Sequence, residues 1–206
     1  ITQNNRLKTI ENIELLIIDD GSTDKSSQVL AKYDTDSRIK IVLQDNIGLI
    51  KSISKAFSMA KGIYVVRVDA DDWVSPSFVD QLVNEIEKDK RIAMVFPNYY
   101  EVDEAGHILH CVKRHDFSSD VTLLDQPAHG ACTMFRKSCL LKINGYDESI
   151  TRQDGYELWL RFIKDFEVNN INIPIFYYRQ HYKSLTKDEK KLLNTRAQIL
   201  ESHANK

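Results

Sequence analysis

Val68-Asp69-Ala70-Asp71-Asp72-Trp73 is the most informative segment of this chain. Three carboxylates fall within four residues, directly after the apolar run at 63–66. A strand that ends in such a cluster brings like charges together at the edge of a sheet, where they repel one another and some take up protons. A divalent cation removes this conflict, because carboxylate oxygens are good ligands for Mg²⁺ or Mn²⁺. The stretch therefore predicts either a metal site that holds phosphates or an acidic turn before the helix that Ser75-Pro76 begins.

A second predicted strand ends in the same way. The mainly apolar run at 13–18 leads into Asp19-Asp20-Gly21-Ser22-Thr23-Asp24. In open α/β sheets, ligands bind beyond the carboxyl ends of the strands, so two acidic strand ends predict one nucleotide-binding edge. The spacing excludes a calcium-binding EF-hand loop. Counted from Asp20, the sixth position is Lys25 and the twelfth is Ala31, where that loop requires glycine and glutamate.

The composition is that of one ordinary globular domain. The chain has 206 residues, 42% of them hydrophobic and 28% charged, which is enough for one sizeable core. The formal net charge of −2 gives no electrostatic case for nucleic acid as a partner. No apolar run reaches the length of a transmembrane segment. Cys111, Cys132 and Cys139 are odd in number and lack CxxC spacing, which argues against a disulfide framework or a zinc site and favours a reducing compartment.

Strands and helices alternate in the first half, which predicts an α/β fold with a mainly parallel sheet. Strands are expected at 13–18, 39–43, 63–68 and 93–97, and helices at 24–33, at 50–60 and after Ser75-Pro76. Phe78, Leu82 and Ile86 line one face of that last helix.

The second half changes character. We expect a hairpin of strands 99–102 and 108–112, a loop at 113–126, strands at 131–136 and 171–179, and helices from about 137 to 145 and at 155–165. Pro174 places the last strand at a sheet edge or at a bulge. Thr186-Lys187-Asp188-Glu189 is a capping box, and the helix that it starts carries an apolar stripe of Leu193, Ala197 and Leu200.

Several short motifs follow one another in a fixed order. They are Ile17-Ile18-Asp19-Asp20-Gly21-Ser22-Thr23-Asp24, Asn46-Ile47-Gly48, Asp69-Ala70-Asp71-Asp72, Gly130-Ala131-Cys132-Thr133-Met134-Phe135-Arg136, Gly145-Tyr146-Asp147-Glu148, Gln153-Asp154-Gly155-Tyr156-Glu157-Leu158-Trp159-Leu160-Arg161 and Tyr178-Arg179-Gln180-His181. Their order and spacing over nearly the whole chain resemble a family 2 glycosyltransferase with the GT-A fold. The resemblance implies an α/β, GT-A-like three-layer fold with a mainly parallel, mixed central sheet. It implies a single domain over 1–206, with a nucleotide-binding half at 1–98, an acceptor-side half at 99–185 and a C-terminal helix at 186–206.

The resemblance also raises an expectation about the start of the chain. Members of the family open with an apolar strand, a turn and a helix, and Ile1-Thr2-Gln3 resembles the tail of that helix. The first strand and most of the first helix are therefore expected to be absent from this numbering. Because that strand contributes to the pocket for the nucleotide base, we expect either residues upstream of Ile1 or impaired nucleotide binding.

By this resemblance, three residues take roles at the metal or the donor, and Asp154 takes the role of the base. Asp71 matches the carboxylate that ligates Mn²⁺ or Mg²⁺, and Asp69 matches one that contacts the donor's ribose or helps at the metal. His181 matches a residue that touches the diphosphate or the metal. Asp72 takes a structural role as the cap of the following helix. Asp154 matches the general base, although the family often carries Glu-Asp here and Gln153 cannot ionise.

The general base is needed because an acceptor hydroxyl is a poor nucleophile until a placed carboxylate takes its proton. Without the resemblance, Asp154 is a helix N-terminal acid favoured by the helix dipole. Asp20 matches the residue that reads the edge of the nucleotide base, and Asp19 serves the same pocket. A carboxylate only accepts hydrogen bonds, so it pairs with a donor such as a uracil N–H, which favours a UDP-sugar. Lys51 reaches a phosphate or is simply solvated, and Trp159 stacks on a sugar ring or packs in the core.

The function implied is a metal-dependent inverting glycosyltransferase. It moves a sugar from a nucleotide-diphosphate donor to the hydroxyl of a glycan or lipid-linked acceptor, in bacterial-type polysaccharide synthesis, in the cytoplasm or bound peripherally at the inner face of the membrane. One alternative is a nucleotidyltransferase of similar α/β build, which needs a glycine-rich, basic phosphate loop near its first strand. The other is a sugar- or nucleotide-binding module without catalysis.

Overall fold

The computed structural model describes residues 12–114, 130–150, 153–181 and 189–204. The strands are β1 (Leu15–Asp20), β2 (Ile39–Gln44), β3 (Tyr64–Val66), β4 (Trp73–Val74), β5 (Ile92–Val102), β6 (Ile108–Val112), β7 (Met134–Arg136) and β8 (Glu167–Arg179). The α-helices are α1 (Ser26–Leu30), α2 (Leu49–Met59), α3 (Phe78–Ile86), α4 (Lys137–Lys142), α5 (Asp154–Asp165) and α6 (Glu189–Ala204), with 3-10 turns η1 (Ala31–Tyr33) and η2 (Gly130–Cys132). The predicted α/β class is confirmed.

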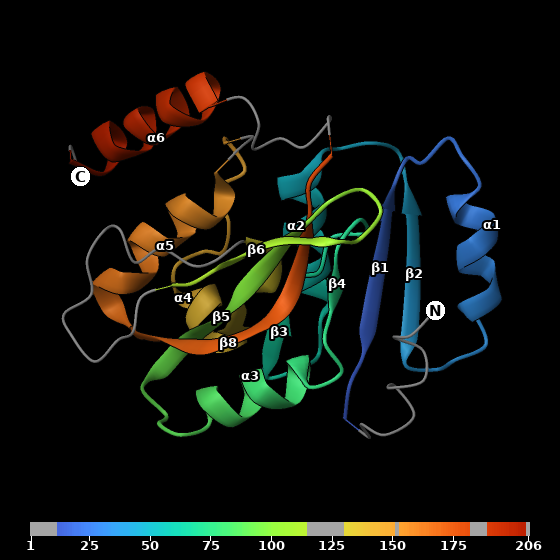
Figure 1. Ribbon diagram of the computed structural model, residues 1–206, viewed down its shortest axis with the longest axis horizontal. Helices are drawn as coiled ribbons and strands as arrows, with labels where there is room; N and C mark the ends of the chain where they lie inside the picture. The colour runs from blue at the N-terminus through green and yellow to red at the C-terminus, as the bar shows by residue number, and fades with distance from the viewer. Residues whose placement is uncertain (1–11, 115–129, 151–152, 182–188, 205–206) are drawn as a thin grey trace.

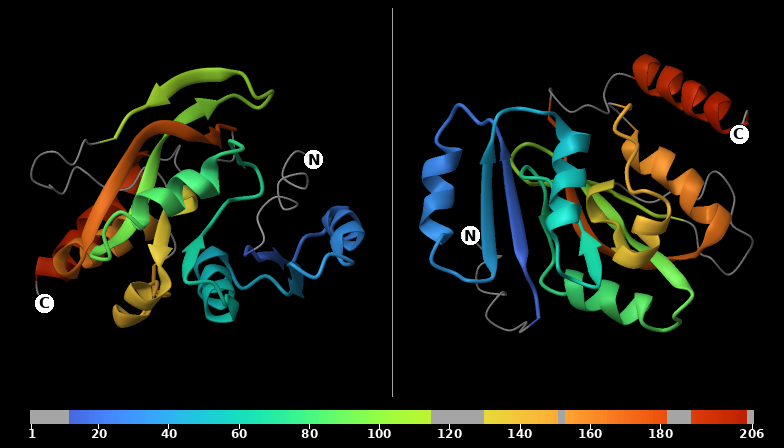
Figure 2. Two further views of the ribbon diagram at one scale, coloured as in Figure 1. Left: turned by 90° about the horizontal axis from the view of Figure 1, so that it is seen from below. Right: turned by 180° about the vertical axis from the view of Figure 1, so that it is seen from behind.

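The strands form two separate sheets within the described residues. β1 and β2 pair in parallel, with Leu15 opposite Ile39 and Asp20 opposite Gln44. The other six form one sheet in the order β3-β7-β5-β8-β4, with β6 paired to β5. The β1–β2 sheet lies with α1 at one end of the molecule's longest axis, and α6 lies at the other end (Figure 1). The views from below and from behind show the same separation (Figure 2).

The larger sheet is mixed, as predicted, but it contains fewer parallel pairs than the alternation of strands and helices suggests. β3 and β5 both run antiparallel to β7, and β5 runs parallel to β8, so β3, β5 and β8 share one direction. β7 comes later in the chain and inserts between β3 and β5 in the opposite sense. β4 and β6 add two further antiparallel pairs at β8 and β5. The alternation of strands and helices correctly predicts that β3 and β5 run in the same direction, but it does not predict that β7 lies between them.

The core forms where helices cover this sheet. α3 packs against β5 and β8, and α5 packs against β8 and η2. The predicted inner face of α3 is confirmed, because Phe78, Leu82 and Ile86 are at most 1% exposed. Leu158 and Phe162 on α5 are fully buried in the same core. Apolar residues at a helical period therefore identified these faces correctly.

Several strands and helices begin or end at residues other than those predicted. β5 is one strand that spans the predicted strand at 93–97 and the first strand of the hairpin. The residue before α3 is Ser77 rather than Ser75, and β4, which precedes it, was not predicted. Pro174 lies in an interior strand, where the register against β5 shifts between Pro97 and Asn98. The bulge, one of the two positions predicted for this proline, is therefore present.

The predicted apolar stripe of α6 is also wrong. Leu193 is 62% exposed and Leu200 is 40% exposed, whereas Ile199 is 3% exposed and belongs to the core. Ala197 is exposed as well. The side of α6 that turns inward instead carries Ile199 together with Arg196 and His203, which contact Gln153 and Glu157 at the start of α5. Three further expectations, the helix tail at 1–3, most of the loop at 113–126 and the start of the capping box, lie outside the described residues. None of the described helices is long and apolar enough to cross a bilayer.

Candidate active site

A buried arginine organises the acidic stretch after β3. Arg67 Nη1 donates a hydrogen bond to Asp154 Oδ2 at 2.9 Å, and Nη2 donates to Asp69 Oδ2 at 3.3 Å. Arg67 Nε also lies 2.9 Å from Asp69 Oδ1, an ion-pair distance, but without the alignment of a hydrogen bond. The guanidinium thus joins two predicted site residues, one from the acidic stretch and one that lies 87 positions away from Arg67.

The charges of Asp69 and Asp154 shift the pKa of Arg67, and those of Arg67 and Asp154 shift the pKa of Asp69, because the three side chains lie close together and are largely shielded from water. The side chains of Arg67 and Asp154 are 11% and 13% exposed. Burial lowers the pKa of the Arg67 guanidinium, but the charges of Asp154 and Asp69 outweigh it, and the net pKa is raised. Burial raises the pKa of the Asp69 carboxyl, with Arg67 opposing the rise and the charges of Asp154 and Asp71 adding to it. The arginine therefore stays charged and holds the carboxylates together.

The start of α5 positions Asp154. It is the first residue of the helix, where the helix dipole favours a negative charge. Gln153 precedes it with a left-handed φ of 58°, and its carbonyl accepts hydrogen bonds from the amides of Tyr156 and Glu157. Arg196 of α6 donates from Nε to Gln153 Oε1 at 2.8 Å. The C-terminal helix thus supports the turn from which Asp154 projects.

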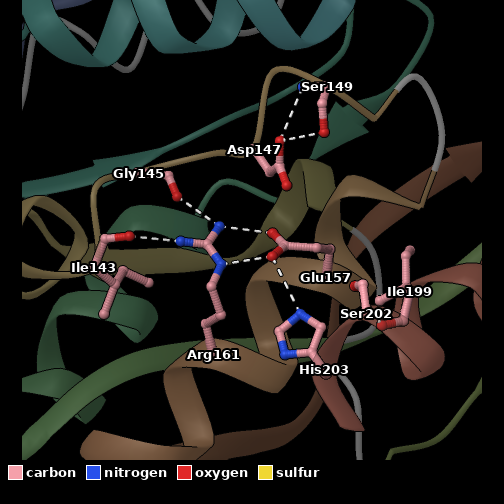
Figure 3. Close-up of polar contacts among 9 residues, drawn as sticks. All are labelled: Ile143, Gly145, Asp147, Ser149, Glu157, Arg161, Ile199, Ser202 and His203. Carbon is pink, nitrogen blue, oxygen red and sulfur yellow. Dashed lines mark hydrogen bonds and ion pairs between the residues drawn. The ribbon is translucent and has the colours of Figure 1, made fainter. Parts of the chain in front are cut away.

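A buried ion pair fixes the next turn of α5 (Figure 3). Glu157 is 4% exposed and accepts two hydrogen bonds of 2.6 Å from Arg161, one from Nε and one from Nη2. Arg161 also donates to the carbonyls of Ile143 at 2.6 Å and Gly145 at 2.7 Å. His203 of α6 places Nε2 3.4 Å from Glu157 Oε1. The guanidinium therefore ties α5 to the segment after α4, and the histidine adds a contact from α6.

Two other predicted site residues, Asp71 and His181, meet near the end of β8. His181 Nε2 lies 3.1 Å from Asp71 Oδ2, and the Asp71 side chain is 45% exposed. Next to it, Arg179 Nε donates to the Asp71 carbonyl at 2.8 Å, and the Arg179 guanidinium lies over the Trp73 ring. The structure therefore brings Asp71 and His181 together, as the sequence predicted, on a surface that a ligand can reach.

Asp72 is a structural carboxylate. It is 8% exposed, and its Oδ1 accepts a hydrogen bond from the Arg179 backbone amide at 2.9 Å. Its partner therefore lies on β8, not at the start of α3 as predicted. Burial raises the pKa of Asp72 to about 7, and the charges of Asp71 and Asp69 add to the rise.

Asp20 holds the loop before α2 at the end of β1. Its Oδ1 accepts hydrogen bonds from Gln44 Nε2 at 2.7 Å and from the Ile47 amide at 3.0 Å, and its Oδ2 accepts one from the Gly48 amide at 2.9 Å. Burial alone would raise the pKa of Asp20, but the hydrogen bonds together outweigh it and lower the pKa. Asp20 therefore shapes this edge of the β1–β2 sheet, and the same oxygens are already engaged by the loop.

The remaining nucleotide residues divide between surface and core. Asp19 is buried at 8% exposure and accepts a hydrogen bond from the Ser22 amide at 2.8 Å, which fixes the turn after β1. Lys51 is exposed in the first turn of α2. Trp159 is fully buried and meets Phe96 edge-on with ring centroids 5.8 Å apart. We therefore assign Trp159 to the core, because a ring without exposed surface offers no face to a sugar.

The donor set at Asp71 and His181 suits a divalent cation. Among the described residues, no group of three or more His, Cys, Asp or Glu side chains is arranged to hold a metal ion. Mg²⁺ is usually held by one or two protein ligands with the rest supplied by substrate phosphates and water, so a carboxylate beside an imidazole fits such a site. Asp69 fits it less well, because Arg67 already occupies its carboxylate.

Sequence reasoning missed Arg67 and gave Tyr146 no role. A signal for Arg67 was present, because a charged residue interrupts the apolar run at 63–68 and lies two residues before Asp69. Tyr146 is 6% exposed, and its hydroxyl has no hydrogen-bond partner in the part of the chain that the structure describes. Burial raises the pKa of its phenol, with the Arg67 charge opposing, which places the ring within the influence of the same cluster.

Comparison with known proteins matches residues 2–143 to glycosyl transferase family 2. Chondroitin synthase from Pasteurella multocida is 28% identical over 80% of this chain, which covers 17% of that protein. The putative glycosyltransferase EpsH from Bacillus subtilis is 26% identical over 97% of the chain, which covers 62% of its length. The chain thus spans less than two thirds of each of these relatives.

A solved structure agrees with the fold. The 1–349 fragment of S. aureus TarS in complex with UDP-GlcNAc superposes with a TM-score of 0.69 at 18% sequence identity. The match covers 90% of this chain and 56% of that one. At this identity the likeness concerns the fold, and it supports the predicted GT-A architecture.

Proposed function

Because the chain belongs to glycosyl transferase family 2, we propose that it transfers a sugar from a nucleotide-diphosphate donor to an acceptor hydroxyl with inversion at the anomeric carbon. The observation that carries this proposal is the bridge through Arg67, which joins Asp154 at the start of α5 to Asp69 in the acidic stretch. A base on one side and donor-binding carboxylates on the other are the two parts that such a transfer needs. The nucleotidyltransferase alternative falls with the family assignment.

Asp154 acts as the general base in this proposal. The acceptor oxygen attacks the anomeric carbon from the side opposite the diphosphate, its proton passes to an Asp154 carboxylate oxygen, and the bond from the anomeric carbon to the diphosphate oxygen breaks. The electron pair of that bond leaves with the nucleoside diphosphate. A single displacement with one base inverts the configuration, whereas retention by double displacement requires a carboxylate placed as a nucleophile.

Asp71 and His181 hold the divalent cation, Mn²⁺ or Mg²⁺, and Asp69 contacts the donor's ribose or helps at the metal. When bound, the cation supplies Lewis-acid stabilisation of the leaving diphosphate. The contact between the Asp71 carboxylate and the His181 ring supports this assignment. Lys51, exposed at the start of α2, is proposed to reach a phosphate.

The nucleotide lies at the carboxyl end of β1, near Asp19 and Asp20, and we propose a UDP-sugar as donor. Asp20 contributes by fixing the loop at 46–48. The TarS fragment was solved with UDP-GlcNAc, which makes that donor the first to test.

The acceptor proposed is a glycan or a lipid-linked saccharide, in bacterial-type polysaccharide synthesis. Relatives named chondroitin synthase support a polysaccharide product. None of the three cysteines, all of them in the described residues, forms a disulfide, which suits the cytoplasm, where a peripheral position at the inner face of the membrane would meet a lipid-linked acceptor.

The first experiment identifies the donor. UDP-, GDP- and CMP-sugars are tested by thermal shift with and without Mn²⁺, because a ligand that binds only the native state raises the melting temperature. Nucleotide release is then measured for every donor that shifts the protein. Metal-dependent release from a UDP-sugar is the expected result. Donor binding without any release in the presence of a wide panel of acceptors would instead indicate a sugar-binding module.

Two variants then separate the metal site from the base. Asp71→Asn should weaken Mn²⁺-dependent donor binding sharply, because the cation loses a charged ligand. Asp154→Asn should leave donor affinity within about threefold while lowering turnover by about 10²–10⁴. Asp165→Asn, at the far and exposed end of α5, is the matched control and should change neither quantity. Near-normal turnover of Asp154→Asn removes it from the mechanism.

A further inference from the structure

Arg67 is a buried cation between two carboxylates from distant segments. Its guanidinium contacts Asp69 through Nε and Nη2 and contacts Asp154 through Nη1. The planar fork of an arginine can serve two carboxylates in fixed directions at once, whereas a lysine presents a single point charge on a flexible stem. The arginine side chain is 11% exposed, so little water competes for these contacts.

We propose that Arg67 is a positioning residue for the general base. It holds Asp154 through Oδ2 and so aims the other oxygen, Oδ1, at the acceptor. Through Asp69 it also links the orientation of the base to the stretch that binds the donor. This inference rests on the proposed role of Asp154 and adds to it a residue that touches neither substrate.

The backbone that covers the bridge supports this role. A Cβ added at Gly130 would lie 3.1 Å from Asp154 Oδ2 and 3.2 Å from Arg67 Nη2. A Cβ added at Gly155 would lie 3.3 Å from the Cα of Gly130. Two glycines therefore let η2 and the start of α5 close directly over the ion bridge. Any side chain at Gly130 must push on both partners, so the geometry of the bridge is tightly set by its surroundings.

A purely structural ion pair predicts a different outcome from a positioning residue. If Arg67 only stabilises the fold, its substitution lowers turnover by the same factor whether or not Asp154 can act as a base. If Arg67 acts through Asp154, its substitution has no further effect once the base is gone. A double-mutant cycle on turnover separates the two cases, because residues that act as a unit are not additive.

The test measures UDP release from a UDP-sugar with water as the acceptor, so no natural acceptor is needed. The proteins are wild type, Arg67→Lys, Asp154→Asn and the double variant. Arg67→Lys should lower kcat by about 10- to 100-fold and change the donor Kd by less than about threefold, and in the Asp154→Asn background it should change kcat by less than about twofold. Arg38→Lys is the matched control, because Arg38 also pairs with an aspartate two residues away, Asp36, on the surface. It should leave kcat unchanged.

Gly130→Ala is a second variant that disturbs the bridge without removing a charge, because it presses one methyl group against Arg67 and Asp154. It should lower kcat and leave the donor Kd unchanged, and it should not change kcat in the Asp154→Asn background. Wild-type turnover in Arg67→Lys would overturn the positioning role alone. The same holds if a variant with wild-type melting temperature loses the same factor in kcat in the wild-type and in the Asp154→Asn background. Full turnover in Asp154→Asn would overturn the base assignment and the positioning role together.

Discussion

Asp71 and Asp72 are adjacent aspartates with opposite environments. The Asp71 side chain is 45% exposed and lies beside His181, whereas Asp72 is 8% exposed and accepts a hydrogen bond from the Arg179 amide. The second oxygen of Asp72, Oδ2, is buried without a hydrogen-bond partner among the described residues. One short acidic motif therefore contains a residue suited to a ligand and a residue that belongs to the interior.

Asp72 should make folding stability depend on pH. Its folded pKa is raised to about 7 from the value of 3.8 that is ordinary for an aspartate. Between these values the unfolded chain has released the proton and the folded chain still holds it, so rising pH favours unfolding. The contribution of Asp72 to stability is therefore greatest below about pH 4 and is lost as the pH rises through about 7.

Asp72→Asn cannot ionise and should remove this dependence. The difference in melting temperature between the variant and wild type should become more favourable by about 3 °C or more from pH 5 to pH 8, measured in buffer with EDTA so that no cation binds nearby. The same difference at both pH values would show that Asp72 is not the group that titrates.

The sequence predicted single residues of the site better than their partners. Asp71, His181 and Asp154 stood out by type and order, and the structure brings the first two together. Arg67 was missed because its significance depends on Asp154, which is 87 positions away. The contacts of Asp20 with the loop at 46–48 and the burial of Trp159 are also set by tertiary packing, and no local pattern encodes them.

At the scale of elements, periodicity succeeded where one face is purely apolar. α3 and α5 bury the faces that their apolar residues mark. α6 is different, because the face that docks mixes polar and apolar residues. Arg196 contacts Tyr156 and also Gln153, which precedes α5, and His203 contacts Glu157, while Ile199 is buried. A pattern that seeks leucines cannot find a face that docks by charged and aromatic contacts.

The docking of α6 can be tested with two neighbouring residues. Ile199 is 3% exposed and Leu200 is 40% exposed, and they have the same number of side-chain carbons on the same helix. Ile199→Ala leaves a cavity in the core to which Ile199 belongs and should cost about 2–4 kcal/mol in the free energy of unfolding. Leu200→Ala should stay within about 0.5 kcal/mol of wild type. Both are measured by urea unfolding, and a larger loss for Leu200→Ala would show that α6 docks through the leucine stripe after all.

At the scale of the whole molecule, packing is uneven. In the six-stranded sheet, Met94, Val95 and Phe96 of β5 are fully buried. In the β1–β2 sheet, Asp19 is the one residue of either strand in the described chain that is buried, and Leu43 is 61% exposed. Parallel strands are normally covered on both faces, so this end of the molecule is held by fewer apolar contacts and by the polar bonds of Asp20.

This unevenness predicts which part of the protein opens first. Regions with few buried apolar contacts open locally at a lower free energy than the core does. In native-state hydrogen exchange without ligand, the paired amides of β1 and β2 should therefore exchange faster than those of β5. Equal exchange rates in the two sheets would show that the β1–β2 unit is as stable as the core.

The proposed nucleotide site lies at the end of this weaker unit, so binding should protect it. Local opening of β1–β2 separates Asp20 from the loop at 46–48 and destroys the site, so a ligand that binds only the closed form slows exchange by the factor 1 + [L]/Kd. UDP with Mn²⁺ at about 100 times its Kd should slow the β1–β2 amides by up to about 100-fold. The exposed edge strand β6 provides the control, because its opening leaves the site intact and its exchange should not change. Protection that appears at β6 but not at β1–β2 would place the nucleotide elsewhere on the molecule.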